Sequence, residues 1–204
     1  MPSVTRKVQA GRTRRDAAES TVFAALGELL AGGATFTELG VQQISKEAGI
    51  GRSTFYVHFA DKTDLLVRFA EDSSRELFAI AERWTDSGDR ETLERTLLEV
   101  IARRREQAPA LRALAEVATY EPAAQEAWQR MIASNIDLVR QRIEADQEAG
   151  LIPAGVDPAI TAAFVTWGVE RTLEQHIEAG GSASDEEVAA AVACAIWKAV
   201  YGSV

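Results

Sequence analysis

The chain has 204 residues, of which 47% are hydrophobic, and a formal net charge of −9 at pH 7. This length is enough to bury roughly 70% of the unfolded surface in one or two small domains, so disulfides or metals are not needed for stability. Cys194 is the only cysteine, the first residues lack an apolar signal core, and no apolar run reaches the roughly 18 residues of a membrane span. A disulfide-rich secreted protein and a membrane protein are therefore excluded, and a cytoplasmic protein is expected.

Charge is unevenly distributed along the chain. Residues 1–62 hold eight basic and six acidic residues, a net +2, whereas the remaining 142 residues hold 14 and 25, a net −11. Five bases and no acid lie within residues 1–15, which favours a basic N-terminal arm near phosphate groups; a solvated, disordered tail is the alternative. The five bases are Arg6, Lys7, Arg12, Arg14 and Arg15.

Apolar residues recur with helical spacing and no alternating strand pattern stands out, so the expected fold class is all-α with about nine helices. A first helix over 13–31 ends at a glycine pair, and two short helices follow at 41–48 and 53–59. The other expected helices cover 62–84, two segments between the breaks at 87–89, Pro109 and 121–122, and then 122–149, 158–179 and 185–202.

The stretch AGIGRSTFYVHF at 48–59 joins the two short helices. Phe55 and Phe59 are four residues apart, so they share one helix face and should anchor the second short helix to the core. Gly49 suits the left-handed conformation that ends the first helix. The opposite face is rich in hydrogen-bond donors, and it carries Arg52, Ser53, Thr54, Tyr56, Val57 and His58. Two short helices joined by a tight turn match a helix-turn-helix, whose second helix enters the major groove of DNA.

The segment TFTELGVQQISKEAGIGRSTFYVHFADKTDLL at 35–66 resembles the DNA-binding signature of the TetR family of bacterial repressors. The resemblance implies a helix-turn-helix DNA-binding domain over 16–65 and a ligand-binding and dimerisation domain over 66–204. It also implies roles for seven residues: Arg52, Ser53 and Val57 would face base edges, whereas Thr54, Tyr56, His58 and Lys62 would mostly hold phosphates. One departure is Gly40, where the family often has a threonine or serine that caps the helix and bonds a phosphate.

The helix expected at 158–179 is apolar on two faces, which is more than a one-sided surface helix would show. One face carries Val165, Val169, Leu173 and Ile177, and the other carries Ile160, Phe164 and Trp167. One of these faces needs an external partner. The family resemblance implies a homodimer through this helix and the last one, a double-stranded palindromic DNA operator, and release by a small lipophilic effector.

The C-terminal part resembles, more weakly, the branch of this family that contains the repressor of the ethionamide-activating monooxygenase. The likeness lies in EAWQRMI at 126–132, VERTL at 169–173 and IWKAVYG at 196–202. It implies a lipophilic tunnel in each sensor domain, with Trp128 and Trp197 as the best candidates for ligand contacts. The implied lining is Leu93, Leu97, Leu98, Ile101, Trp128, Ile132, Asn135, Val139, Thr166, Val169, Leu173 and Trp197. Plain core packing is the alternative for each of these residues.

Nothing in the sequence points to a reaction centre. The two histidines, His58 and His176, are 118 positions apart, and HExxH, GxSxG and P-loop motifs are absent. No cofactor or metal is implied. The arginine run at 103–105 is expected to form a solvated face, because consecutive helical residues diverge by about 100°. A ligand-independent DNA-binding or architectural protein remains the alternative to a regulator that a ligand releases.

Overall fold

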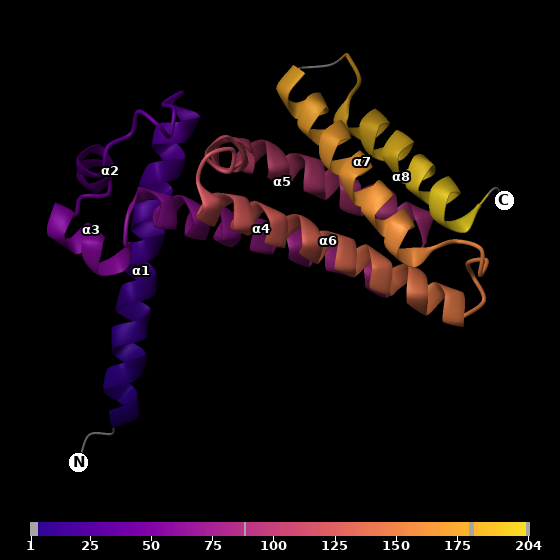
Figure 1. The fold of residues 1–204 in the computed structure, drawn as a ribbon, viewed down its shortest axis with the longest axis horizontal. Coiled ribbons are helices and arrows are strands. Elements are labelled where there is room, and N and C mark those ends of the chain that lie inside the picture. The colour runs from indigo at the N-terminus through magenta and orange to yellow at the C-terminus, as the bar shows by residue number, and fades with distance from the viewer. Residues whose placement is uncertain (1–3, 88, 180–181, 203–204) are drawn as a thin grey trace. The chain divides into compact units, whose positions relative to one another are not determined.

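The computed structural model describes residues 4–87, 89–179 and 182–202, and within these ranges the chain folds into eight α-helices without a strand (Figure 1). Their bounds are α1 Val4–Ala31, α2 Val41–Glu47, α3 Arg52–His58, α4 Lys62–Ser87, α5 Arg90–Val117, α6 Pro122–Glu148, α7 Pro158–Ala179 and α8 Asp185–Tyr201. The prediction of an all-α fold is confirmed, but the helices of the described residues number eight instead of about nine.

The difference in helix number lies at Pro109. Separate helices were expected on its two sides, yet α5 contains Pro109 in its interior. Proline removes the hydrogen bond that would reach the carbonyl of Arg105, and it costs a helix interior about 3 kcal/mol. Leu111, Leu114 and Val117 follow it and are buried, and burying one such side chain is worth about 1.5–3 kcal/mol. Packing of the downstream segment therefore outweighs the lost hydrogen bond.

The first helix is longer than its apolar pattern indicated. A start near Thr13 was expected, whereas α1 begins at Val4, so most of the backbone of the predicted basic arm is helical. The side chains of residues 1–16 lie outside the described part of the structure. A contact between this segment and DNA phosphates therefore remains a prediction.

The chain divides into two compact units. Unit 1 consists of residues 1–71 and 109–127, and unit 2 consists of residues 72–108 and 128–204. The sequence suggested one cut after residue 65, whereas in the structure the second part of α5 and the start of α6 belong to unit 1.

The core of unit 1 contains three buried phenylalanines. Phe36, Phe55 and Phe59 are almost fully buried there, together with aliphatic residues of α1, α2 and α4. The ring of Phe59 lies 5.3 Å from that of Phe55 and 6.0 Å from that of Phe23 on α1. This packing joins α3 to α1, as the spacing of the two phenylalanines predicted.

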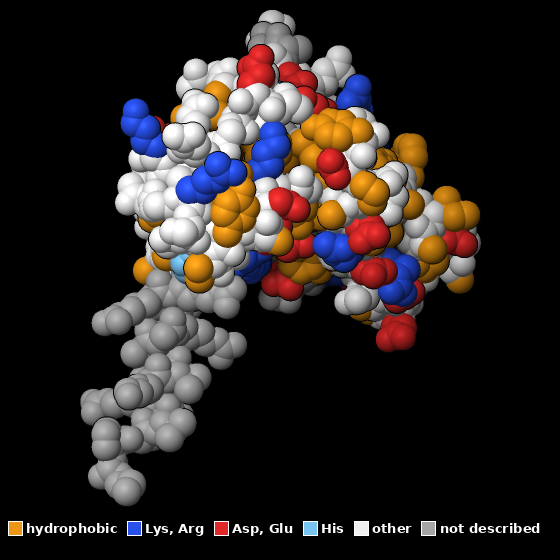
Figure 2. All heavy atoms as spheres, turned by 60° about the vertical axis from the view of Figure 1, so that its left-hand side comes forward, with side chains coloured by type: hydrophobic (Ala, Val, Ile, Leu, Met, Phe, Trp, Pro, Cys, Tyr) orange, Lys and Arg blue, Asp and Glu red, His pale blue; other side chains and the backbone are white. Residues whose placement is uncertain are grey.

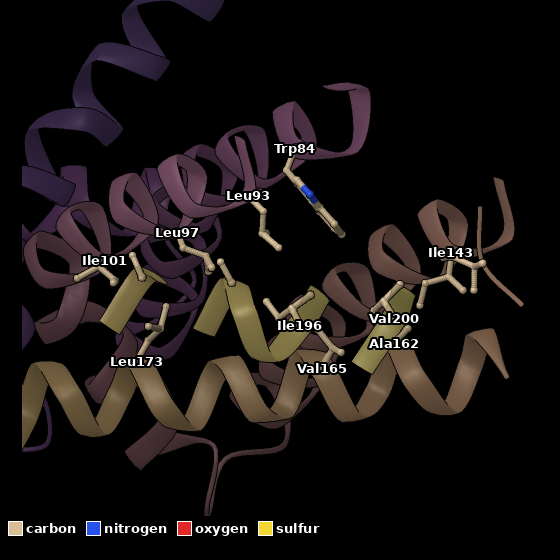
Figure 3. Packing of buried hydrophobic residues seen from close by; sticks show 13 residues of the cluster. Trp84, Leu93, Leu97, Ile101, Ile143, Ala162, Val165, Leu173, Ile196 and Val200 are labelled. Carbon is tan, nitrogen blue, oxygen red and sulfur yellow. The ribbon is translucent and has the colours of Figure 1, made fainter. Parts of the chain in front are cut away.

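Five helices contribute to the core of unit 2 (Figure 3). The close-up shows Trp84 of α4 and Leu93, Leu97 and Ile101 of α5 pointing towards side chains of α7 and α8. The remaining members of the cluster are Ile143, Ile152, Ala162, Val165, Leu173, Ala189, Ala193, Ile196 and Val200. This core is mostly aliphatic, with one tryptophan at its edge.

Among the helices of the described ranges, none is sufficiently long and apolar to span a membrane.

Candidate DNA-binding helix and sensor cavity

A glycine turn sets the direction of α3 relative to α2. Gly49 has a φ of +65°, in the left-handed region that side chains other than glycine rarely adopt. The amide of Ile50 donates to the carbonyl of Ser45 over 2.9 Å, which closes the end of α2, and Gly51 then begins α3 as its N-cap. The predicted left-handed glycine and the two short helices are confirmed.

One face of α3 is anchored and the other is exposed. Phe55 is fully buried, whereas Tyr56 is 46% exposed and Val57 is 72% exposed. We call the exposed residues the outer face of α3; they are Arg52, Ser53, Thr54, Tyr56 and Val57. An exposed valine is costly in water and suits contact with a thymine methyl group.

Tyr56 is oriented by its neighbours on the same helix. Its ring packs edge-on against that of Phe55, with 5.4 Å between centroids, and the guanidinium of Arg52 lies 5.8 Å from the Tyr56 centroid. A cation over an exposed aromatic ring is worth about 0.5–1 kcal/mol. These contacts therefore restrict the side chains of Arg52 and Tyr56 even in the absence of DNA. Figure 2, which turns the left-hand side of Figure 1 forward, shows basic side chains there separated by mostly uncharged surface.

Lys62, one of the predicted phosphate contacts, is engaged within the protein. Its Nζ donates to the backbone carbonyls of Phe36, Thr37 and Leu39 over 3.3, 3.0 and 3.4 Å, and it lies 5.0 Å from the centre of the Phe36 ring. An ammonium group has three donors, and all three have acceptors here. Lys62 therefore ties the start of α4 to the turn that precedes α2.

His58, another predicted phosphate contact, also points inward. Its side chain is only 10% exposed, and Nδ1 lies 3.6 Å from a carboxylate oxygen of Glu19 on α1 without a hydrogen-bond partner. Arg68 of α4 donates to the backbone carbonyl of His58 over 2.8 Å and pairs with Glu19. Sequence reasoning missed Glu19 and Arg68, because no local pattern links residues so far apart in the chain.

Unit 2 contains a cavity of about 150 Å³ that we call the sensor cavity. Residues of α4, α5, α6, α7 and α8 line it. Six of the twelve residues predicted to line a ligand tunnel lie here: Leu93, Leu97, Asn135, Val139, Thr166 and Val169. The other lining residues are Leu77, Ala81, Trp84, Thr96, Val100, Arg104, Leu138, Val165, Glu170 and Ile196.

The other six predicted lining residues lie elsewhere. They are Leu98, Ile101, Trp128, Ile132, Leu173 and Trp197. Ile101 and Leu173 are fully buried members of the core, and Trp197 stacks on Tyr201 with 4.2 Å between ring centroids. Neither tryptophan that the sequence favoured borders the cavity. Helical spacing of large apolar residues indicates which face is buried, but it does not separate core packing from a cavity wall.

The tryptophan that does line the cavity, Trp84, lies next to a charged network. The guanidinium of Arg142 lies 5.9 Å from the Trp84 ring centre, and its Nε donates to Asp146 over 2.7 Å. The hydroxyl of Tyr201 donates to the same carboxylate. Burial, and after it the neighbouring Asp146 carboxylate, raise the pKa of Tyr201 to about 12. This network joins the end of α6 to the end of α8.

The arginine run at 103–105 is not simply a solvated face. Arg103 pairs with Glu76 and Glu106, and Arg105 pairs with Asp185 of α8 over 2.6 Å. The side chain of Arg104 is only 13% exposed and makes a two-pronged ion pair with Glu170 of α7, both partners lining the sensor cavity. The interpretation as a solvated face was therefore wrong for Arg104. The three side chains do diverge, but each one reaches an acid on another helix.

An apolar surface remains on α7. Ile160 is 71% exposed, Phe164 is 72% exposed and Trp167 is 49% exposed, and their spacing places them on one side of the helix. The opposite side, with Val165 and Leu173, is buried in unit 2. The prediction of two apolar faces is confirmed, and only one of them is covered within the described part of the chain.

The eight-helix fold with an exposed α3 defines a helix-turn-helix regulator with a separate helical sensor unit. Residues 30–69 match the family of tetR-type bacterial regulatory proteins, and residues 93–202 match the C-terminal domain of the transcriptional regulator EthR. The chain belongs to the TetR family of bacterial transcriptional regulators. Members of this family are DNA-binding transcription factors and not enzymes.

Several solved structures share this fold. A TetR-family protein from Rhodococcus sp. is 24% identical with a TM-score of 0.71, covering 92% of this chain and 98% of that one. Another from Mesorhizobium loti is 23% identical with a TM-score of 0.70 and covers 93% and 99%. GusR of Salmonella enterica is 16% identical with a TM-score of 0.73 and covers 90% and 95%. These likenesses establish the fold only. No curated protein sequence matches the chain significantly.

Proposed function

We propose that the protein is a cytoplasmic transcriptional repressor that binds a palindromic operator as a homodimer and leaves it when a small lipophilic effector occupies the sensor cavity. The observation that carries this proposal is the outer face of α3, which is exposed on a helix whose other face is locked by Phe55. A rigid helix with outward donors is the part that a helix-turn-helix places in the major groove.

The residues of the outer face divide into base readers and phosphate contacts. Arg52, Ser53 and Val57 read base edges, and Arg52 is suited to a bidentate contact with guanine, worth about 1–3 kcal/mol of discrimination. Thr54 and Tyr56 hold phosphates and set the register of α3 on the duplex. The basic residues of the N-terminal arm add sequence-independent attraction to DNA.

His58 and Lys62 have a different part in this proposal from the one that the family resemblance implied. Both side chains are turned towards the protein, where Lys62 bonds three carbonyls and His58 faces Glu19. They act as positioning residues that hold α3 and the turn before α2. Any phosphate contact by either group requires it to leave these partners.

Dimerisation through α7 and α8 accounts for the uncovered apolar surface. Ile160, Phe164 and Trp167 are exposed in the single chain, and a two-fold partner would remove them from water. On the neighbouring helix α8 three alanines recur every four residues on the exposed side and allow close helix approach. They are Ala191, Ala195 and Ala199. Such a dimer spaces its two α3 helices about 34–36 Å apart along one side of the DNA.

Release from DNA follows if the effector binds one arrangement of the dimer more tightly than the other. A hundredfold preference shifts the equilibrium by about 2.7 kcal/mol, and equal affinity for both arrangements shifts nothing. The presence of a cavity inside unit 2 favours this scheme over the alternative of a ligand-independent architectural protein.

Selection of binding sites from a random DNA library with the full-length protein tests the proposal. We expect a palindrome whose half-site centres are 10–10.5 base pairs apart, or a multiple of that, bound by at least two chains. Footprinting of the selected site with wild type and Tyr56→Ala then checks that α3 is the reading helix. Binding without sequence preference, or by a single chain to one half-site, contradicts the proposal and favours the architectural alternative.

A further inference from the structure

Two residues that line the sensor cavity each carry a buried polar atom without a hydrogen-bond partner in the described structure. Trp84 is 5% exposed and Thr166 is 8% exposed, and both line the cavity. Among the described residues, neither Nε1 of Trp84 nor Oγ1 of Thr166 has a hydrogen-bond partner; the same holds for one atom each of Ser45, His58 and Gln107, which are not part of the cavity lining. Roughly 90% of buried polar groups in native proteins have a partner, so two unpaired groups at one cavity need an explanation.

The two atoms differ in what they can bind. An indole N–H can only donate a hydrogen bond, whereas a threonine hydroxyl can donate or accept. The N–H of Trp84 therefore needs a hydrogen-bond acceptor, and the hydroxyl of Thr166 can donate to the same acceptor or to a second one. A purely apolar occupant would leave both groups unpaired.

The charges at the cavity wall cancel. Among the described residues that line it, Arg104 and Glu170 are the only charged ones; the side chain of each is 13% exposed, and the two terminal nitrogens of the arginine pair with the two carboxylate oxygens. An anionic occupant would lie near Glu170 or have to displace it from Arg104, and separating a buried pair leaves an uncompensated charge. A neutral occupant avoids that cost.

The volume limits the size of the occupant. At about 150 Å³ the cavity is comparable to an engineered cavity in another protein that accepts one benzene ring. Most of its wall consists of aliphatic side chains such as Leu93, Val139 and Ile196. The part of an occupant that lies inside this volume is therefore apolar and close to one ring in size.

We infer that the sensor cavity takes a neutral, mainly apolar molecule of about one ring that carries a hydrogen-bond acceptor such as a carbonyl oxygen, bound by the indole N–H of Trp84 and the hydroxyl of Thr166. The inference rests on the proposed function only in identifying this molecule as the effector. Binding itself does not depend on DNA.

Three probes of nearly equal size separate the contributions of polarity and charge. Acetophenone has a carbonyl acceptor, isopropylbenzene replaces it with a methyl group, and benzoate adds a negative charge. Calorimetry or dye displacement on the full-length protein at neutral pH should show acetophenone binding about tenfold more tightly than isopropylbenzene, because only the ketone satisfies the donors. Benzoate should bind more weakly than acetophenone.

Two variants assign that difference to its donors. Thr166→Val removes the hydroxyl at nearly constant volume, and Trp84→Phe removes the N–H, so each should weaken acetophenone binding about three- to tenfold while changing isopropylbenzene binding much less. Trp197→Phe is the matched control, since Trp197 is outside the cavity, and it should leave all three affinities unchanged. Circular dichroism confirms that each variant is folded before its affinities are compared.

The inference is overturned if isopropylbenzene or benzoate binds as tightly as acetophenone, if none of the three binds at millimolar concentration, or if Thr166→Val has no effect in a folded protein. These outcomes leave the proposed function standing when the selected operator is still bound and another compound releases it. Conversely, donor-dependent binding of acetophenone to a protein that never binds an operator supports the inference and contradicts the proposed function.

Discussion

The two units of this protein differ in where their polar groups are open to a binding partner. In unit 1 Lys62 donates to three carbonyls and Arg68 bonds Glu19 and the carbonyl of His58; two buried atoms, Ser45 Oγ and His58 Nδ1, have no partner among the described residues, and the polar outer face of α3 is exposed. In unit 2 the wall of the sensor cavity keeps two buried polar atoms without a partner. A surface that reads DNA gains from rigidity, whereas a cavity that recognises a ligand gains from groups that only the ligand can satisfy.

The largest expected effect comes from removing Phe55, the side chain that anchors α3 to the core of unit 1. Phe55→Ala should lower the free energy of unfolding by about 3–5 kcal/mol, because it removes a fully buried ring from the core of unit 1. Val57→Ala, on the exposed side of the same helix, should change it by no more than about 0.5 kcal/mol. Urea denaturation measures both, and equal effects of the two substitutions would contradict the description of an anchored helix.

The next largest effect is expected at the ion pair of the cavity wall. Glu170→Leu leaves Arg104 buried without its partner and should destabilise the protein by about 3 kcal/mol. Replacing both residues, Arg104→Met with Glu170→Leu, should recover most of that loss, since no unpaired charge remains. A double-mutant cycle from thermal unfolding gives the coupling. A cycle with no coupling would mean that the pair does not hold α5 to α7.

Two substitutions on the outer face of α3 should both weaken DNA binding, but the two losses should depend on the DNA sequence in different ways. Arg52→Ala should cost about 1–3 kcal/mol at one base position and relax the preference there. Tyr56→Ala should weaken binding to every operator variant by a similar factor, because the proposed contact is to a phosphate and Tyr56 also orients Arg52. Binding assays on a set of single-base operator variants measure both patterns. Sequence-independent loss in Arg52→Ala would remove it from the base readers.

The smallest effect concerns alkaline pH. The pKa of Tyr201 is raised to about 12 in the folded protein, above its ordinary value near 10, so the phenol is neutral in both states below pH 10. Between pH 10 and 12 the unfolded chain ionises first, and stability falls as pH rises. Because Tyr201 is only half-buried, we expect this loss to be about 1 kcal/mol.

Tyr201→Phe supplies the control for this pH dependence. The variant lacks the hydroxyl that bonds Asp146, so it should be less stable than wild type at neutral pH and should lose the additional decline above pH 10. Unfolding curves at pH 8, 10 and 11 measure the difference. A decline of the same steepness in wild type and variant would assign the alkaline effect to other groups.

Local patterns predicted the helix-turn-helix part of the fold well. The glycine turn, the two short helices and the burial of Phe55 and Phe59 depend on residues within about a dozen positions of one another, where backbone preference and helical period act directly. The cavity was predicted only in part. Trp84, Arg104 and Glu170 were missed because they lie on three helices and meet only when those helices pack.

At Pro109 and His58 a prediction from local sequence preference differed from the structure. The local preference of proline is to end a helix, but the apolar residues after it are buried and α5 continues. The position of His58 on α3 suggested an outward side chain, but Glu19 and Arg68 form a neighbourhood that turns it inward. In both cases a contact between distant segments outweighs a local tendency.

By itself, the order of residues determined the all-helical class, the bounds of most helices and the face of α3 that is exposed, because these follow from short-range periodicity and turn chemistry. Only the tertiary structure decided which of the buried side chains border a cavity, which arginine of the 103–105 run pairs with which acid, and which polar atoms are left without a partner. Those properties arise where helices from distant parts of the chain meet, and no short-range pattern encodes that meeting.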